Sequence, residues 1–316
     1  MAGAPGGAGS AGAPSGGAAG AGRGATPAVW AALGVGLLVI GTSPILVRLA
    51  GDVPALALAA WRVVFVTALV LPVAAVRSGA EIRALGRRDR LLIGAAGAVL
   101  GLHFMAWIAA VQLTSVASAS VLVTLSPVFI VVLGAVFLRE RPTRRVLAAI
   151  VVAVAGAALI GASGGGAGQY PDPVLGNALA LLAALLVAVY LLIGRAVRQR
   201  TSFLAYFAPL NAAAAVTCVG VCLAAGVPLA LPLPALAFAF ALGVGPGLIG
   251  HGSFNLALGS LTAAFLGLLS LGEPVISATL AFVAFGERPA PLALFGMAVV
   301  LAAISAVLVA GREGEG

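Results

Sequence analysis

The sequence has few charged residues and no lysine. Only 8% of its 316 residues are charged, whereas 62% are hydrophobic. In an ordinary soluble domain about a quarter of the residues carry charge. A soluble fold of this length would leave too much apolar surface in contact with water. The scarcity of charge therefore excludes a soluble protein and indicates an integral membrane protein, in which each span needs roughly 20 apolar residues.

Cysteine and histidine are scarce as well, with two residues of each. Cys218 and Cys222 lie four residues apart in an apolar run, and we interpret them as buried space-filling side chains, not as a disulfide framework or a two-ligand metal site. We find no spaced metal ligands, no paired carboxylates and no Gly-Lys-Ser/Thr phosphate-binding motif. We therefore expect no metal and no cofactor.

The basic residues are all arginines, and they give a net charge of +8. They lie in short tracts between apolar runs and not in one patch, so the charge does not indicate a nucleic-acid partner. Fourteen of the seventeen fall on one side of the expected membrane, mainly in Arg77–Arg90, Arg139–Arg145 and Arg195–Arg200. By the positive-inside rule that side is cytoplasmic, and both termini are expected there.

Ten apolar runs are expected to be transmembrane helices. They do not alternate with a period of two, so strands are excluded, and lipid admits only helices or closed barrels. The expected spans are Val29–Ala50, Pro54–Val76, Leu91–Gln112, Ser115–Leu138, Val146–Ser163, Val174–Gly194, Phe203–Gly226, Ala235–Leu258, Thr262–Phe285 and Pro291–Ala310.

The chain contains the same five-span unit twice. A proline and, thirteen residues later, a Glu-Arg-Pro triplet occur at Pro127 and Glu140, and again 147 residues on at Pro274 and Glu287. Because five is an odd number, the second copy enters the membrane upside down. Inverted repeats of this kind are a transporter architecture. The expected fold is an all-α integral membrane protein with ten transmembrane helices in two inverted five-helix repeats.

The repeat also predicts the domain organisation. Residues 1–26 consist almost only of Gly, Ala, Ser and Pro and are expected to be a disordered tail. The first repeat is expected over 27–163, a Gly- and Pro-containing linker over 164–173, the second repeat over 174–311, and a short tail over 312–316.

Prolines inside the expected spans mark candidate breaks in the helices. Each one removes a backbone hydrogen bond and frees a carbonyl that lipid cannot satisfy. The strongest break is the glycine-rich run Gly243–Gly250, which ends directly before His251. Glycines also allow close helix packing, and this reading stays open beside the first. The five prolines are Pro44, Pro127, Pro209, Pro246 and Pro274.

Two charged side chains lie well inside expected spans. Glu273 is expected to carry a proton or hold a cationic group, or else to be a structural carboxyl that bonds a backbone group freed near Pro274. Arg62 stays charged, so it pairs with Glu273, with an anionic substrate group, or in a purely structural ion pair. Arg48 lies close enough to the end of its span to extend its guanidinium into the headgroup region, which is the interpretation we adopt.

The two histidines occupy near-equivalent positions of the repeats. His103 lies 24 residues before one repeat proline and His251 lies 23 before the other. Both are candidates for a proton relay or a substrate contact, with an ordinary hydrogen-bonded core role as the alternative. Trp107 and Asn255 follow the histidines by four residues and share their helix faces. The candidate substrate- or ion-binding set is therefore Arg62, His103, Trp107, His251, Asn255 and Glu273.

Several motifs in this order and spacing resemble the drug/metabolite transporter superfamily, specifically its EamA-like ten-span carriers. They are Ala59–Arg62, His103 through Ser126-Pro127 to Glu140, Gly250-His251, Asn255–Leu258, Gly272–Val275 and Gly286-Glu287. The resemblance implies transport of small metabolites, amino acids or drugs across the bacterial inner membrane, through a cavity between the repeats. The first repeat has Ser126 where the second has Glu273, so the halves are expected to contribute unequally.

We therefore expect a secondary active transporter with a small-molecule substrate, embedded in the lipid bilayer and working by alternating access. Coupling to protons is a hypothesis based on Glu273 and the histidines. The alternatives are a non-transporting structural or signalling membrane protein and, as the weaker one, a membrane-embedded enzyme. The sequence leaves open the substrate, the direction of transport, the coupling ion and the oligomeric state, a homodimer included.

Overall fold

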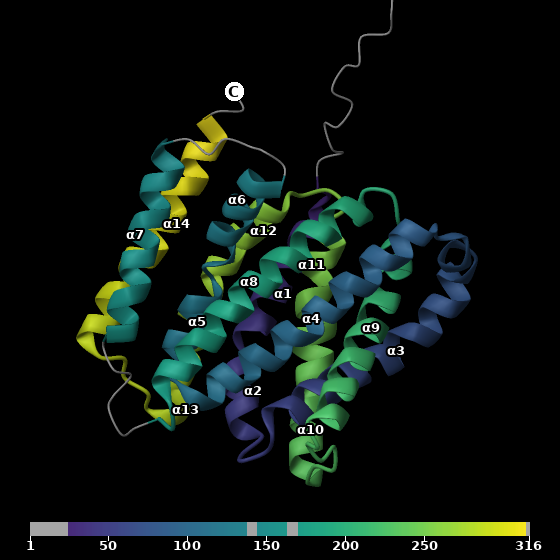
Figure 1. Ribbon diagram of the computed structural model, residues 1–316, viewed down its shortest axis with the longest axis horizontal. Coiled ribbons are helices and arrows are strands. Elements are labelled where there is room, and N and C mark those ends of the chain that lie inside the picture. The colour runs from purple at the N-terminus through teal and green to yellow at the C-terminus, as the bar shows by residue number, and fades with distance from the viewer. Residues whose placement is uncertain (1–24, 138–143, 163–169, 314–316) are drawn as a thin grey trace, which may run out of the picture.

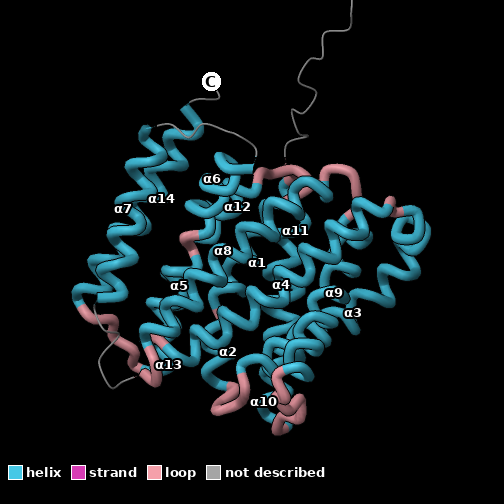
Figure 2. Tube along the Cα trace, viewed as in Figure 1, coloured by secondary structure: helices cyan, strands magenta, loops and turns pink. Residues whose placement is uncertain are grey.

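The computed structural model describes residues 25–137, 144–162 and 170–313, and the regular structure in these ranges is helical (Figure 1; Figure 2). Most of both expected tails, most of the linker and the residues around Glu140 fall outside these ranges. In chain order the elements are α1 (Pro27–Gly41), α2 (Ser43–Leu49), α3 (Ala55–Ala84), α4 (Arg87–Leu113), α5 (Val116–Val123), α6 (Ser126–Phe137), α7 (Arg144–Ala162), α8 (Pro173–Arg198), α9 (Phe203–Ala224), α10 (Leu233–Leu242), the π-helix η1 (Gly243–His251), α11 (Gly252–Ala257), α12 (Ala263–Leu269), the 3-10 helix η2 (Ser270–Gly272), α13 (Glu273–Phe285) and α14 (Pro291–Glu313).

These helices fit a membrane protein by length and composition. Among the described residues, eight helical stretches are long and apolar enough to cross a bilayer. The other two expected spans coincide with α7 and α14. Many large apolar side chains face outward, for example Leu38 at 60% exposed and Val76 at 88%. In water such a surface would be a liability, whereas lipid accepts it. The expectation of a helical membrane protein is confirmed.

The arginine tracts are more helical than the sequence suggested. The segment Arg77–Arg90 was expected to be a loop, but α3 continues to Ala84 and α4 begins at Arg87, which leaves only Leu85 and Gly86 between them. Similarly, α8 continues past the expected end to Arg198. Arginine favours helix and its long stem can place the charge in water while the backbone stays helical. Charge therefore marks where a span leaves the apolar layer, not where its helix stops.

Four of the five flagged prolines mark helix breaks. Pro44, Pro127 and Pro274 each stand in the first turn of a new helical piece, where the missing N–H costs no hydrogen bond. Pro246 lies in η1, whose backbone has a wider turn than an α-helix. Pro209 is the exception, because α9 continues through it.

The packing of the helices has a regular pattern. Helix α3 lies against α9, and α7 lies against α14 as a pair at one side of the bundle (Figure 1). Helix α4 packs on α8, and η1 with α11 packs on α1. Helix α1 begins and α14 ends in the upper part of the view, and the connection between α3 and α4 also lies in the upper half, at the right and away from both (Figure 1). We call this upper side the Gly86 end, and the opposite end, where Gly51–Val53 follows α2, the Gly51 end.

Glycines allow the central helices to approach closely. A Cβ placed on Gly97 of α4 would lie 2.6 Å from the Cβ of Ala213 in α9, and one on Gly243 of η1 would lie 2.8 Å from the carbonyl oxygen of Arg62 in α3. Both distances are too short for a real side chain, so these positions require glycine. The glycine-rich run thus serves the break and the close packing together.

Candidate substrate-binding cavity

The broken helices surround a cavity of about 70 Å³ in the middle of the bundle. Its wall comes from both halves of the chain. The first half contributes side chains from α1 to α6, and the second half contributes side chains from α8 and from the elements η1 to α13. Broken helices are how membrane transporters bring polar backbone and side chains to a site at the middle of the bilayer.

Arg62 is the cation of the cavity. Its side chain is buried, with 2% of the residue exposed, and its guanidinium carbon lies 3.9 Å from the centre of the Phe104 ring. The ring face attracts the cation, by about 2 kcal/mol where both are shielded from water. Nε of Arg62 has no hydrogen-bond partner among the described residues. The guanidinium is therefore held in place by an aromatic ring and retains donors for a further acceptor.

Glu273 faces the same cavity from the first turn of α13. The carboxylate is 8% exposed and stands at a helix N-terminus, where the helix dipole favours negative charge. Within the described ranges, no ion pair closer than 4 Å joins it to Arg62. Arg62 and Glu273 therefore face one cavity without a direct contact, although they interact electrostatically across it.

The two histidines meet across the cavity. Their ring centres are 6.1 Å apart, and Phe104 contacts both, with its ring edge-on to His251 at 4.9 Å. Nδ1 of His103 lies 2.8 Å from the carbonyl oxygen of Ala183. A carbonyl only accepts, so Nδ1 carries the hydrogen and Nε2 of the neutral ring is left as an acceptor.

Asn255 takes a supporting position. It is fully buried and does not line the cavity; its amide nitrogen donates to the hydroxyl oxygen of Tyr190 at 2.5 Å and to the carbonyl of His251 at 2.7 Å. Tyr190 does line the cavity. Since its oxygen already accepts from Asn255, the phenol hydrogen remains for another acceptor.

The structure thus brings together five of the six predicted residues on one surface: Arg62, His103, Trp107, His251 and Glu273. Sequence reasoning missed Phe104 and Tyr190. Phe104 is adjacent to His103, and in a helix adjacent residues point about 100° apart, so no spacing rule placed it in the cavity. Tyr190 seemed an ordinary aromatic residue of a span; its distance of 65 residues from Asn255 gave no signal of their contact.

Metal chemistry finds no support in the ligands. Over the part of the chain that the structure describes, no three His, Cys, Asp or Glu side chains are grouped to hold an ion. Cys218 and Cys222 are both buried with free thiols in α9.

Comparisons with known proteins place the chain in a family. The profile of the EamA-like transporter family matches residues 26–162 and again residues 174–309. The chain belongs to the EamA-like transporter family. It is a multi-pass membrane transporter with a small-molecule substrate, and a protein of this kind is generally not an enzyme.

Solved structures and a curated protein are similar to this EamA-like transporter. The "Probable terminal-alkyne amino-acid exporter" of Streptantibioticus cattleyicolor is 31% identical over 201 residues, which are 59% of this chain and 62% of that protein. The match therefore spans less than two thirds of the relative's length. A crystal structure, at 22% identity, covers 92% of this chain and all of its own with a TM-score of 0.66. That likeness shows the fold.

Proposed function

We propose that the protein is a secondary carrier that exports small amino-acid-like metabolites by alternating access, with its substrate in the central cavity. The observation that carries this proposal is the separation of charges there. Arg62 offers free donors, Glu273 offers a carboxylate, and no ion pair within 4 Å joins the two. A zwitterion supplies the opposite charge to each of them. The aromatic rings of Phe104 and Trp107 form an apolar wall for a short side chain.

The relative's name supports this class of substrate. A terminal-alkyne amino acid is a zwitterion with a small, apolar, electron-rich tail. The cavity of about 70 Å³ is well below the volume of an ordinary ligand pocket, so a bulky tail would need the surrounding helices to move further apart than a small one. Glu273, His103 and His251 form the polar path by which a proton is exchanged for the substrate. The substrate-binding set of this proposal is the five predicted residues that line the cavity together with Phe104 and Tyr190, while Asn255 holds Tyr190 in position.

Alternating access requires two halves that can exchange their roles, and the packing pattern supports ten spans in two inverted repeats. The second span (α3) lies on the seventh (α9), and the fifth (α7) lies on the tenth (α14), so each of these spans contacts the equivalent span of the other repeat. The third span (α4) packs on the sixth (α8), and the eighth span, through η1 and α11, packs on the first (α1). This is the pattern that a twofold axis in the membrane plane produces. The repeats extend over 27–163 and 174–311.

The proposed orientation has the Gly86 end in the cytoplasm of a bacterial cell, with both termini inside and the protein in the inner membrane. The arginine bias of the α3–α4 and α8–α9 connections supports this orientation. The same orientation is supported by the start of α1 and the end of α14, which both lie in the upper part of the view (Figure 1).

Counterflow into proteoliposomes tests the function. The purified full chain is reconstituted with unlabelled propargylglycine inside, and uptake of the same labelled amino acid is followed. We expect saturable uptake above that of empty liposomes, inhibited by other small apolar amino acids and not by their amides. Uptake that stays at the level of empty liposomes for every small amino acid offered would refute the proposal.

A further inference from the structure

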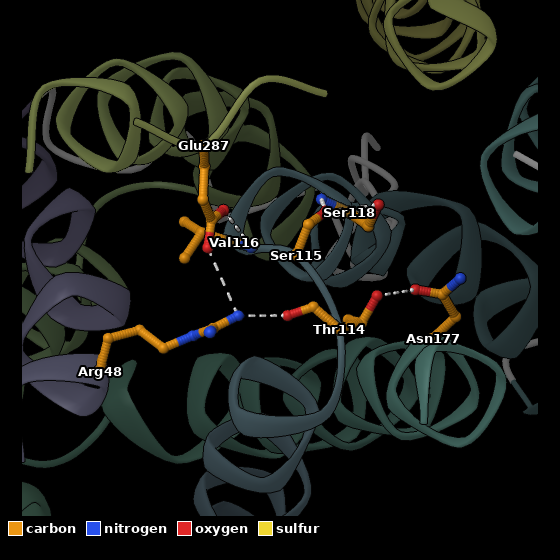
Figure 3. Close-up of polar contacts among 7 residues, drawn as sticks. All are labelled: Arg48, Thr114, Ser115, Val116, Ser118, Asn177 and Glu287. Carbon is orange, nitrogen blue, oxygen red and sulfur yellow. Dashed lines mark hydrogen bonds and ion pairs between the residues drawn. The ribbon is translucent and has the colours of Figure 1, made fainter. Parts of the chain in front are cut away.

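A network of polar contacts ties the two halves together at the Gly51 end (Figure 3). Nη2 of Arg48, at the end of α2, donates to the carbonyl oxygen of Thr114 at 2.6 Å and lies 3.5 Å from Oε1 of Glu287. The other carboxylate oxygen of Glu287 accepts from the backbone N–H of Val116 at 3.1 Å. Arg48 was expected to extend into the headgroup region; at the end of its helix its guanidinium contacts three partners, if the ring of Tyr170 at 5.3 Å is included.

Each charged side chain of the pair lies at a helix end whose partial charge is opposite to its own. Thr114 caps the C-terminus of α4, whose carbonyls carry partial negative charge, and Arg48 bonds this carbonyl. Val116 is the first residue of α5, whose N–H groups carry partial positive charge, and Glu287 accepts from it. The α4–α5 connection therefore favours the cation on the side of α4 and the anion on the side of α5.

The same pair lies at the far ends of two helices that start at the cavity. Ser43, in the first turn of α2, and Glu273, in the first turn of α13, both line the cavity. From there α2 runs to Arg48, and α13 runs to Phe285, two residues before Glu287. The hydroxyl of Ser277 donates to the carbonyl of Gly41 at 3.0 Å and holds α13 to the end of α1. Separation of α2 from α13 would open the cavity toward the Gly51 end.

Tyr170 adds a third member from the segment before α8. Its ring lies against the guanidinium of Arg48, and its hydroxyl is near enough to Glu287 for that carboxylate to affect its pKa. Burial raises the pKa of Tyr170 to about 12, and the negative charge of Glu287 acts in the same direction. The phenol therefore stays protonated at neutral pH.

We propose that Arg48 and Glu287 form a latch, supported by Tyr170, that closes the substrate cavity toward the Gly51 end and must open in each transport cycle. This inference rests on the proposed alternating-access function. Arg48 is 24% exposed and Glu287 10% exposed by side chain, so water can reach and separate the pair once α2 moves. A pair that keeps some contact with water is easier to break repeatedly than a fully buried one, which would resist separation.

Thiol labelling from each side of the membrane tests the latch without knowledge of the substrate. In a C218A/C222A background, the reporter is Ser43→Cys, because Ser43 is buried, lines the cavity and has an unpaired hydroxyl. A second reporter, Asp52→Cys in the exposed Gly51–Val53 connection, establishes which face of the vesicle the Gly51 end occupies. A membrane-impermeant methanethiosulfonate is applied to right-side-out and to inside-out vesicles.

We expect Glu287→Gln and Arg48→Gln each to raise the labelling rate of the Ser43 reporter from the Gly51 end by roughly tenfold, within the range of typical conformational couplings. The double variant should be no more reactive than either single variant, since both remove the same contact. The matched control is Arg200→Gln, which removes an ion pair with Asp89 at the Gly86 end. That control should leave labelling from the Gly51 end unchanged or lower.

Equal labelling of the Ser43 reporter in the parent and in both latch variants, with the Asp52 reporter reacting normally, would overturn the latch. Labelling that increases as expected, together with counterflow that is absent for every amino acid, would support the latch and refute the proposed substrate class instead. If the C218A/C222A background does not fold, the native background serves, because Cys218 and Cys222 are fully buried and their reaction can be subtracted.

Discussion

Replacement of Arg62 by Gln should remove the ability of the protein to distinguish a carboxylate from its amide. Arg62 is buried against Phe104, no ion pair within 4 Å joins it to Glu273, and its Nε is unpaired. A carboxylate that enters the cavity would form a shielded, hydrogen-bonded pair with this cation. Removal of one partner from such a pair costs about 2–5 kcal/mol. That cost corresponds to binding weakened by roughly 30-fold to several thousandfold, since about 1.4 kcal/mol is tenfold.

Isothermal titration calorimetry in nanodiscs measures this loss of affinity as a cycle of two proteins and two ligands. The ligands are a small apolar amino acid and its carboxamide, and the proteins are the parent and the Arg62→Gln variant. We expect the variant to lose affinity for the amino acid and to bind the amide as the parent does, with a coupling of at least about 2 kcal/mol. Arg62→Lys keeps the charge without the planar fork and should fall between the two.

Equal losses for both ligands, with a coupling below about 0.5 kcal/mol, would refute the reasoning. Arg62 would then be a structural cation whose role is to hold Phe104 and the surrounding helices. The apparent melting temperature of the same variant gives an independent measure of such a structural role.

Three further outcomes follow from the structure. Glu273→Gln should abolish the acceleration of uptake by an imposed pH gradient, because the side chain can no longer release a proton; a variant whose rate ratio with and without the gradient equals that of the parent would contradict proton coupling through this residue. Tyr190→Phe should weaken binding of ligands with an acceptor by about fivefold, the value of one hydrogen bond near 1 kcal/mol, whereas Tyr206→Phe, which removes a buried and unpartnered hydroxyl, should not. Gly97→Ala should destabilise the protein by about 1–3 kcal/mol in thermal denaturation, because its methyl group meets α9 at less than 3 Å. Gly94→Ala on the same helix meets no atom within 4 Å and should be neutral or stabilising; equal melting temperatures for the two alanine variants would exclude the close contact.

The membrane class and the positions of the helices were predictable because both depend on local composition. A run of about 20 apolar residues is sufficient to indicate a span, and helix is found at each expected position. Helix ends were less predictable. The arginines after Val76 mark the end of the apolar layer, yet α3 continues to Ala84, since the backbone hydrogen bonds of a helix do not require lipid.

In the candidate site, the sequence predicted those residues that stand out by their charge or by their equivalent positions in the two repeats. Buried charge in a span is costly, so Arg62 and Glu273 stood out by type alone. Their separation in the cavity depends on how α3 and α13 pack, which no residue spacing encodes. The partners of Arg48 were not predictable for the same reason: Thr114 and Glu287 are 66 and 239 positions away in the sequence.

The wide turn of η1 resolves a discrepancy in the numbering of the two repeats. Arg48 and Arg195 are 147 residues apart, but His103 and His251 are 148 apart, so the second copy has one additional residue before its histidine. A π-helical segment accommodates one such insertion without interrupting the span. Deletion of a single residue from Gly243–Gly250 would return the segment to ordinary α-helical phase and rotate all that follows by about 100°. His251 would then turn away from His103, and Asn255 would lose Tyr190, although neither residue had been altered.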